Sequence, residues 1–155
     1  MPISLPRCLV WLLLVAFHGS ACAALGSDID SVKTDHVFMK AAIPIQKATH
    51  PGYTVHEIQS PDRITVREYV SQNGKVFAVA WEGMHIPDLQ QMLGTYFQQY
   101  VAAAQEARSA MKGRRPLDLQ KPGLMVQTGG HSQSFWGRAI ASDWAPLGVD
   151  LEQIR

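Results

Sequence analysis

The clearest alternation of apolar and polar positions lies between residues 63 and 112, where it predicts strand, turn, strand and helix. Two runs rich in β-branched and aromatic residues, Arg63 to Ser71 and Lys75 to Glu82, are separated by Gln72-Asn73-Gly74, which supplies the positive φ angles of a hairpin turn. The second run is apolar at consecutive positions, a pattern typical of a strand that is buried on both faces. We therefore expect this strand in the middle of a sheet.

The turn leaves two pairings of this hairpin open. If Asn73-Gly74 alone forms the turn, Val66 lies opposite Trp81. If the turn contains a bulge, Tyr69 lies opposite Phe77. We favour the bulged pairing because it brings two aromatic rings together.

A long amphipathic helix is predicted from Pro87 to Lys112. Pro87 suits the first helical position, and Asp88 follows it where the helix dipole favours an acid. Apolar residues recur at the three-and-four spacing of one helical face, namely Leu89, Met92, Leu93, Tyr96, Phe97, Tyr100, Val101 and Ala104. We interpret Gly94, inside this pattern, as a close approach of the helix to the sheet.

The remaining segments predict shorter elements. Gly26 to Ala42 has a weak helical pattern, and Tyr53 to Gln59 adds a strand that completes a three-stranded meander. A C-terminal hairpin joins residues 124–128 and 134–140, and the Pro-containing stretches 43–52 and 114–122 are interpreted as connections. Residues 147–155 form either a short helical turn or a frayed tail. The predicted fold is α+β, an antiparallel sheet of about five strands with the long helix on one face and a short N-terminal helix.

The first residues have the order of a secretory signal peptide. Arg7 precedes an apolar run from Cys8 to Phe17, and small residues follow it. The run is shorter than the roughly 20 apolar residues that a membrane span needs. We expect cleavage after Ala23, which leaves residues 24–155 as one exported domain, periplasmic or secreted, without a transmembrane segment.

Cleavage there would also remove both cysteines, Cys8 and Cys22, so the mature domain would have no disulfide, thiolate nucleophile or cysteine metal ligand. Gly19 stands where bacterial lipid-attachment motifs usually have leucine, so we favour cleavage over a lipid anchor at Cys22. Loss of Arg7 takes the 14 basic residues to 13, equal to the 13 acidic ones. This balance does not favour nucleic-acid binding.

The sequence carries no recognisable catalytic motif. The histidines of the expected mature chain form neither a His-Glu-x-x-His nor a His-x-His pair, so we predict no metal and no cofactor. His131 and Ser132 follow Gly129-Gly130 without a Gly-x-Ser-x-Gly motif, which indicates a hairpin tip. We interpret Glu68 and Glu82 as exposed residues or as ion-pair partners of arginines, and we assign no catalytic residue.

Candidate binding residues gather in and after the C-terminal hairpin. Trp136 and Trp144 lie there, close in sequence to Gly130 and Gly137, where an aromatic side chain is often exposed for contact with a ligand or partner. We name Trp136, Trp144 and His131 as the predicted binding residues.

Several motifs in one order resemble a known family. They are Gly52-Tyr53-Thr54-Val55-His56-Glu57, Val66-Arg67-Glu68-Tyr69-Val70-Ser71, Gly74-Lys75-Val76-Phe77-Ala78-Val79-Ala80-Trp81, Leu93-Gly94-Thr95-Tyr96-Phe97 and Gly129-Gly130-His131. Together they are similar to the DUF2844 family of secreted proteins from Gram-negative bacteria, over roughly residues 24–155. The resemblance implies export and a single small domain, and it implies no substrate, cofactor or catalytic residue.

The leading hypothesis is a non-catalytic binding or interaction domain of the bacterial cell envelope, whose partner is an envelope protein or a small ligand. A small envelope hydrolase or metal-dependent enzyme is the alternative, with His85, His131 and either Glu68 or Asp88 as its site. A structural component of the envelope is the third hypothesis.

Overall fold

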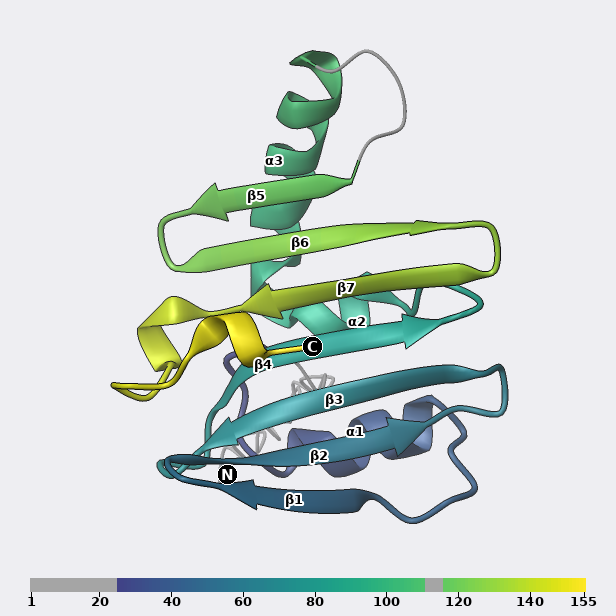
Figure 1. Cartoon of the computed structure of the whole chain (residues 1–155), viewed down its shortest axis with the longest axis vertical. Coiled ribbons are helices and arrows are strands. Elements are labelled where there is room, and N and C mark those ends of the chain that lie inside the picture. The colour runs from purple at the N-terminus through teal and green to yellow at the C-terminus, as the bar shows by residue number, and fades with distance from the viewer. Residues whose placement is uncertain (1–24, 111–115) are drawn as a thin grey trace, which may run out of the picture.

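The structure, a computed structural model, describes residues 25–110 and 116–155 and is built on one antiparallel sheet of seven strands (Figure 1). In chain order the strands are β1 (Gln46–His50), β2 (Tyr53–Gln59), β3 (Ile64–Ser71), β4 (Val76–Gly83), β5 (Leu117–Lys121), β6 (Leu124–His131) and β7 (Ser134–Ile140). They lie side by side in the order β1-β2-β3-β4-β7-β6-β5. The apolar strand β4 is therefore in the middle of the sheet, as its sequence predicts.

The meander β2–β3–β4 and the hairpin β6–β7 are confirmed. Over most of the β3–β4 pair the register is that of the two-residue turn, with Val66 opposite Trp81. A bulge does occur, but it lies within the strands, where Tyr69 pairs with Ala78 and Phe77 is left as the extra residue. The favoured pairing of Tyr69 with Phe77 is therefore wrong, although their rings still meet, with centroids 6.2 Å apart.

The expected number of about five strands is also wrong, because β1 and β5 come from segments interpreted as connections. All five residues of β1 are exposed, so this edge strand has no buried face that its sequence could reveal. In β5, Leu117 and Leu119 are buried and alternate with exposed residues. Pro116 and Pro122 on either side of this short period-two pattern favoured the interpretation as a connection. Proline beside a strand is nevertheless tolerated at the edge of a sheet, where β5 lies.

The predicted long helix is present but interrupted, and it begins at Leu89 with Asp88 as its N-cap, while its expected end at Lys112 lies outside the described residues. It consists of α2 (Leu89–Leu93), a 3-10 turn η1 (Gly94–Tyr96) and α3 (Phe97–Ala110). Gly94 has a φ of 49° and a ψ of −120°, a conformation that residues with a Cβ rarely adopt. The glycine therefore permits a break in the predicted helix, while the close approach to the sheet expected at Gly94 stays a prediction.

One face of the sheet, the helix face, is covered by α1 (Ser31–Phe38), α2 and α3, which lie behind the sheet in Figure 1. The main core under these helices includes Leu25, Val32, Val66, Val79, Trp81, Met92, Leu93, Tyr100 and Val126. The indole ring of Trp81 lies against Gly137 on the neighbouring strand β7, in the space that a Cβ would fill. A glycine at this position is therefore required for the largest side chain of the core.

The other face, the open face, is covered in part by residues 145–155, the C-terminal segment (Figure 1). This segment contains the 3-10 turn η3 (Leu151–Gln153), which is the helical alternative predicted for the tail. Ile154 is only 1% exposed and packs in one apolar cluster with Tyr69, Phe77 and Ile140. The end of the described chain is therefore packed on the sheet and is not frayed.

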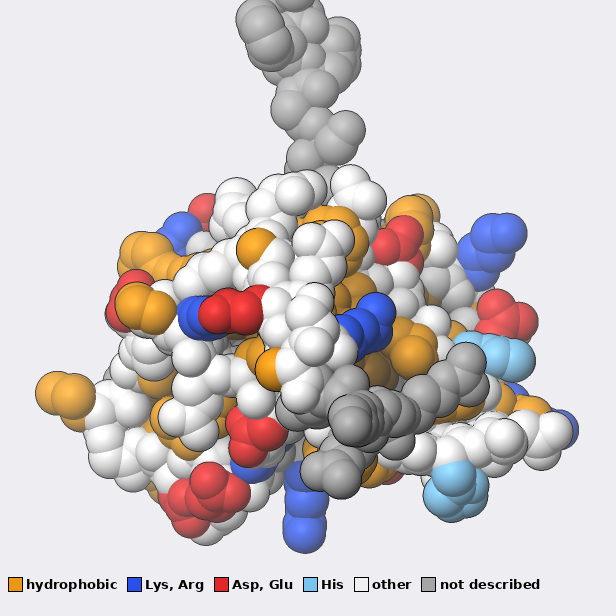
Figure 2. Space-filling view, turned by 90° about the horizontal axis from the view of Figure 1, so that it is seen from above, with side chains coloured by type: hydrophobic (Ala, Val, Ile, Leu, Met, Phe, Trp, Pro, Cys, Tyr) orange, Lys and Arg blue, Asp and Glu red, His pale blue; other side chains and the backbone are white. Residues whose placement is uncertain are grey.

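Charges of both signs are interspersed on the end of the molecule that is seen from above in Figure 2. Among the described side chains visible there, basic and acidic groups alternate with apolar and uncharged polar ones. This end of the molecule therefore carries no field of a single sign.

No helix within residues 25–110 and 116–155 combines the length and the apolar character that crossing a membrane requires. The predicted signal peptide, its cleavage after Ala23 and the lipid anchor considered at Cys22 lie outside the described residues.

Because Ile154 is buried against the sheet, Ile154→Ala should lower the free energy of unfolding by about 2 to 4 kcal/mol, the usual cost of such a truncation in a core. Urea unfolding followed by tryptophan fluorescence measures this change. Leu147→Ala is the matched control, because Leu147 is fully exposed and its loss should change stability by no more than about 0.5 kcal/mol. Equal effects of the two substitutions would contradict a packed C-terminal segment.

Candidate functional site

Two arginines flank the middle of the open face. Arg67 on β3 and Arg138 on β7 both pair directly with Ala80 on β4. Directly paired residues of neighbouring strands present their side chains on the same face of a sheet. The small Ala80 belongs to the same apolar cluster as Ile154, so the C-terminal segment reaches the sheet between the two arginines.

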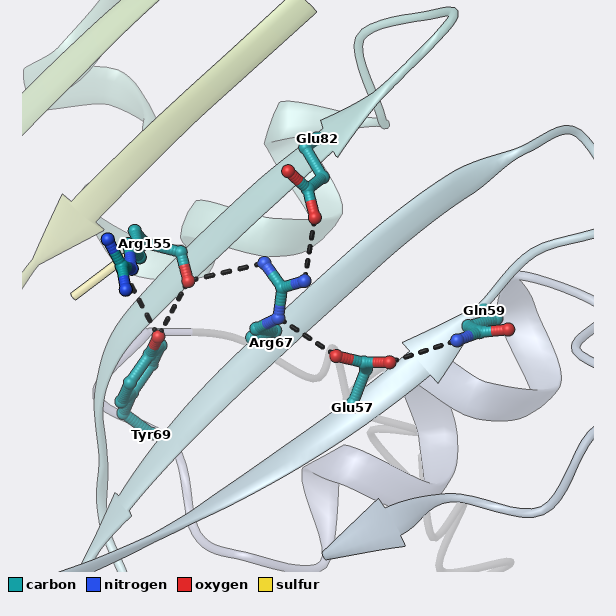
Figure 3. Close-up of polar contacts among 6 residues, drawn as sticks. All are labelled: Glu57, Gln59, Arg67, Tyr69, Glu82 and Arg155. Carbon is teal, nitrogen blue, oxygen red and sulfur yellow. Dashed lines mark hydrogen bonds and ion pairs between the residues drawn. The ribbon is translucent and has the colours of Figure 1, made fainter. Parts of the chain in front are cut away.

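Arg67 is the centre of a hydrogen-bonded network (Figure 3). Its Nε donates to Oε2 of Glu57 at 2.9 Å, and its Nη2 donates to Oε1 of Glu82 at 2.6 Å. Gln59 Nε2 donates to the other carboxylate oxygen of Glu57 at 2.9 Å. The hydrogen bond from Gln59 and then the contact with Arg67 lower the pKa of Glu57, so its carboxylate stays charged.

Tyr69 and Arg67 together hold the main chain of Arg155 (Figure 3). The Tyr69 hydroxyl donates to the Arg155 carbonyl oxygen at 2.8 Å and accepts from the Arg155 N–H at 3.2 Å. Arg67 Nη1 donates to the same carbonyl oxygen at 3.3 Å. Burial raises the pKa of Tyr69, which keeps the hydroxyl protonated as the donor.

Arg138 holds the other side of the C-terminal segment. Its Nη1 donates to the carbonyl oxygens of Leu151, Glu152 and Ile154 at 3.1, 3.2 and 3.0 Å. Its Nη2 donates to Oε2 of Glu152 at 3.0 Å, and its Nε donates to Oε1 of Gln127 at 2.7 Å. All three nitrogens of this guanidinium group are therefore engaged.

Two grooves flank the C-terminal segment on the open face. The first has a volume of about 800 Å³ and is lined by Gln46, Lys47, Ala48, His50, Tyr53, Val55, Glu57, Arg67, Tyr69, Glu82, Glu152, Gln153 and Arg155. The second has a volume of about 600 Å³, and its lining includes Arg63, Glu82, Met84, Gln127, Gln133, Phe135, Trp136, Arg138, Glu152 and Arg155. We call the second the Trp136 groove. Both volumes are in the range of sites for small ligands.

Trp136, a predicted binding residue, is 47% exposed in this groove. It pairs with Glu82 on one side and with Gly129 on the other. A Cβ on Gly129 would lie 2.7 Å from the Trp136 ring, so the indole rests over the glycine backbone. One side of the ring is thus supported by β6 while the ring remains accessible to a ligand.

The structure does not bring the three predicted binding residues together. Trp144 lies beyond the opposite end of β7, in another groove of about 400 Å³, where Lys75 Nζ lies 5.3 Å from its ring centroid. His131 is exposed at the tip of the β6–β7 hairpin, and its Nδ1 lies 3.3 Å from the carbonyl oxygen of Ser132. Trp136 is therefore the only one of the three that lines the Trp136 groove.

Glu68, considered for the alternative enzyme site, lies on the helix face and is 1% exposed. The carboxyl group of Asp35 on α1 is near enough to raise the pKa of Glu68, and it accepts a hydrogen bond from Gln91 Nε2 at 2.7 Å. Neither carboxyl oxygen of Glu68 has a hydrogen-bond partner among the described residues. Burial and the adjacent Asp35 carboxyl raise the pKa of Glu68 well above its ordinary value, and burial also raises the pKa of Asp35. Ionising both of these buried, neighbouring carboxyl groups would cost much free energy, so the pair retains a proton.

His56 lies directly opposite Glu68 in the β2–β3 pair and is also buried. Burial and then the charge of Lys47 lower the pKa of His56, so the imidazole stays neutral. Its Nε2 lies 3.2 Å from Thr54 Oγ1. Neither groove of the open face is lined by His56 or Glu68, so this polar cluster has no path to a ligand there.

The other residues of the alternative enzyme site are not joined to Glu68. His85 and His131 are exposed on a loop and a hairpin tip. Asp88 is engaged as the N-cap of α2, accepting from the N–H groups of Gln90 and Gln91 at 2.9 and 3.1 Å. In the described part of the chain, no three His, Cys, Asp or Glu side chains are grouped to hold a metal ion.

The sequence predicted Trp136 as a binding residue but did not single out Arg67 and Arg138. The ion pair with an arginine that was expected for Glu82 is present, and its partner is Arg67. The same expectation is wrong for Glu68, which is neither exposed nor paired with a described arginine, because it follows Arg67 directly and so points to the opposite face. Arg138 pairs with Glu152, not with either glutamate of the central strands. The sequence does show one arginine within each of two otherwise apolar strands. That Arg67 and Arg138 lie on the same face, on either side of Ala80, follows only from the pairing of β4 with β7.

Replacement of Glu68 by glutamine tests the buried carboxyl pair. A raised folded-state pKa contributes stability that is present below the ordinary value of 4.5 and is lost as the pH rises through the raised pKa. The glutamine side chain cannot ionise, so Glu68→Gln should gain on the wild type by up to about 1.4 kcal/mol per pH unit across this window. Urea unfolding from pH 4 to pH 8 gives the difference.

The control for this experiment is Leu147→Ala, a change of a fully exposed side chain that carries no titratable group. Its difference from the wild type should not grow with pH. A difference between Glu68→Gln and the wild type that is constant from pH 4 to pH 8 would show that Glu68 has no raised pKa in the folded protein.

Comparison with known proteins adds one match. No curated protein and no solved structure matches the chain. The family model described as "Protein of unknown function (DUF2844)" matches residues 21–154, a range that includes the seven strands and three α-helices of the described residues. The chain therefore belongs to the DUF2844 family.

Proposed function

We propose that this protein is an exported, non-catalytic binding domain of the bacterial envelope and that its ligand binds in the Trp136 groove. The observation that carries the proposal is the position of the Trp136 indole, which is supported by Gly129 and 47% exposed in a groove of about 600 Å³. A large aromatic ring held in place contributes contact area at little cost in side-chain entropy.

The groove also has rigid walls. The side chain of Glu82 is bonded to Arg67, and the Arg138 guanidinium group is bonded to Gln127 and to the C-terminal segment. Strand residues positioned by such hydrogen bonds hold a binding site more precisely than residues on free loops. The groove therefore combines an accessible ring with polar groups of fixed orientation.

Export is supported by the order of residues 1–23, and the contacts of the first described residue are compatible with cleavage after Ala23. Leu25 is 1% exposed, and its N–H donates to the carbonyl oxygen of Met92 at 3.1 Å. Cleavage after Ala23 would leave this contact intact. The hydrolase alternative has no comparable support, because Glu68 is enclosed on the helix face while His85 and His131 are on the surface.

Native mass spectrometry of the protein purified without denaturation from its own host tests this proposal. We expect a chain that begins at Ala24 and carries a non-covalent adduct, and we expect Trp136→Ala to lose that adduct because the variant lacks the indole. Trp144→Ala is the matched control, since Trp144 lies in a different groove.

The outcomes separate the hypotheses. An uncleaved chain would contradict export. An adduct that survives Trp136→Ala, or that is lost with Trp144→Ala alone, would move the binding site away from the Trp136 groove. A chain that forms homo-oligomers without any adduct would favour the structural component.

A further inference from the structure

We propose that the Trp136 groove binds a small ring compound that carries a carboxylate, with the ring stacked on Trp136 and the carboxylate held by Arg63. The inference rests on the proposed function, since it names the ligand class of the same groove. It follows from the charges that line the open face and from the position of the indole.

The two grooves of the open face are lined by more basic than acidic side chains. The basic residues lining its two grooves are Lys47, Arg63, Arg67, Arg138 and Arg155, and the acidic ones are Glu57, Glu82 and Glu152. Each of these acids is in an ion pair with Arg67 or Arg138. The sites for a cation are thus already occupied within the protein, whereas positive charge remains for an anion.

Arg63 and Arg155 are the cations of the Trp136 groove that are in no ion pair with an acidic side chain of the described residues. We choose Arg63 because it lies at the Trp136 end of the sheet, where its neighbour Ile64 and the residue before Trp136, Phe135, both pair with Gly83. Arg63 is exposed, and within the described residues no acidic side chain lies within ion-pair distance of it. Its Nη1 contacts the Met84 sulfur at 3.7 Å, a weak acceptor that leaves the other guanidinium donors free. A guanidinium group binds a carboxylate through two parallel hydrogen bonds, and the planar fork favours this geometry.

Trp136 sets the shape of the ligand. Its ring lies over Gly129 on β6 and is accessible in the groove, so a flat apolar surface can stack on it. Both the apolar face of a sugar ring and an aromatic ring provide such a surface. Gln127 and Gln133 line the same groove and supply amide groups for hydroxyl groups of a ligand.

The experiment follows the indole N–H signal of Trp136 by two-dimensional NMR of the full mature chain during titration with four probes. Glucuronate and benzoate carry a carboxylate on a sugar and on an aromatic ring, and glucose and benzyl alcohol are their neutral counterparts. We expect the two anions to shift the Trp136 signal with a Kd of about 1 mM, as ligands of this size allow. Each neutral counterpart should bind about tenfold more weakly, because it lacks the charge-assisted bonds to Arg63.

Three variants test the assigned roles. Arg63→Gln should weaken binding of the anions about tenfold and leave the neutral probes unchanged. Gly129→Ala should weaken all four probes, because its methyl group would displace the indole ring without removing it. Arg108→Gln, at an exposed position on α3 on the other side of the sheet, should have no effect.

The result also identifies the type of ring, because stronger binding of glucuronate than of benzoate indicates a sugar acid and the reverse indicates an aromatic acid. Equal binding of anionic and neutral probes, or anion binding unchanged by Arg63→Gln, would overturn the ligand class while leaving a Trp136 site. The absence of any Trp136 shift at about 20 mM probe would also overturn it, since a millimolar Kd saturates the site there. The proposed function fails separately, if the native adduct does not depend on Trp136.

Discussion

The pairing of β4 with β7 is the constraint on which the rest of the structure depends. These strands join a meander from the first half of the described chain to a hairpin from the second half, and both are antiparallel neighbours in the middle of the sheet. Trp81 fits against the helix face because its direct partner on β7 is Gly137. A substitution that separated these strands would divide the sheet into two parts, each with an exposed apolar edge.

The same pairing assembles the candidate site. It places Arg67 and Arg138 on either side of Ala80, so that the two arginines can hold opposite sides of the C-terminal segment. It also brings Trp136 beside Glu82, which is bonded to Arg67. The Trp136 groove therefore draws residues from several segments of the chain, and no single segment would form it alone.

Strand alternation explains why adjacent residues have such different environments. Arg67 and Glu68 are neighbours on β3, yet one lies in an open network of charges and the other is enclosed under α1. Successive side chains of a strand point to opposite faces, and here one face is covered by helices while the other is covered only in part. Arg67 and the glutamates bonded to it keep contact with water. Glu68 and Asp35 are desolvated and together retain a proton.

Local patterns in the chain were enough to predict the central strand, the meander, the second hairpin, a helical region after Pro87 and the exposure of Trp136. Each of these depends on periodicity or turn chemistry within about ten residues. The same patterns did not reveal β1, which has no buried face, or the break at Gly94. Only the folded chain reveals the β4–β7 pairing and which segments cover each face of the sheet. It therefore also reveals which residues line the groove beside Trp136. These features depend on contacts between residues far apart in the sequence, which local patterns do not specify.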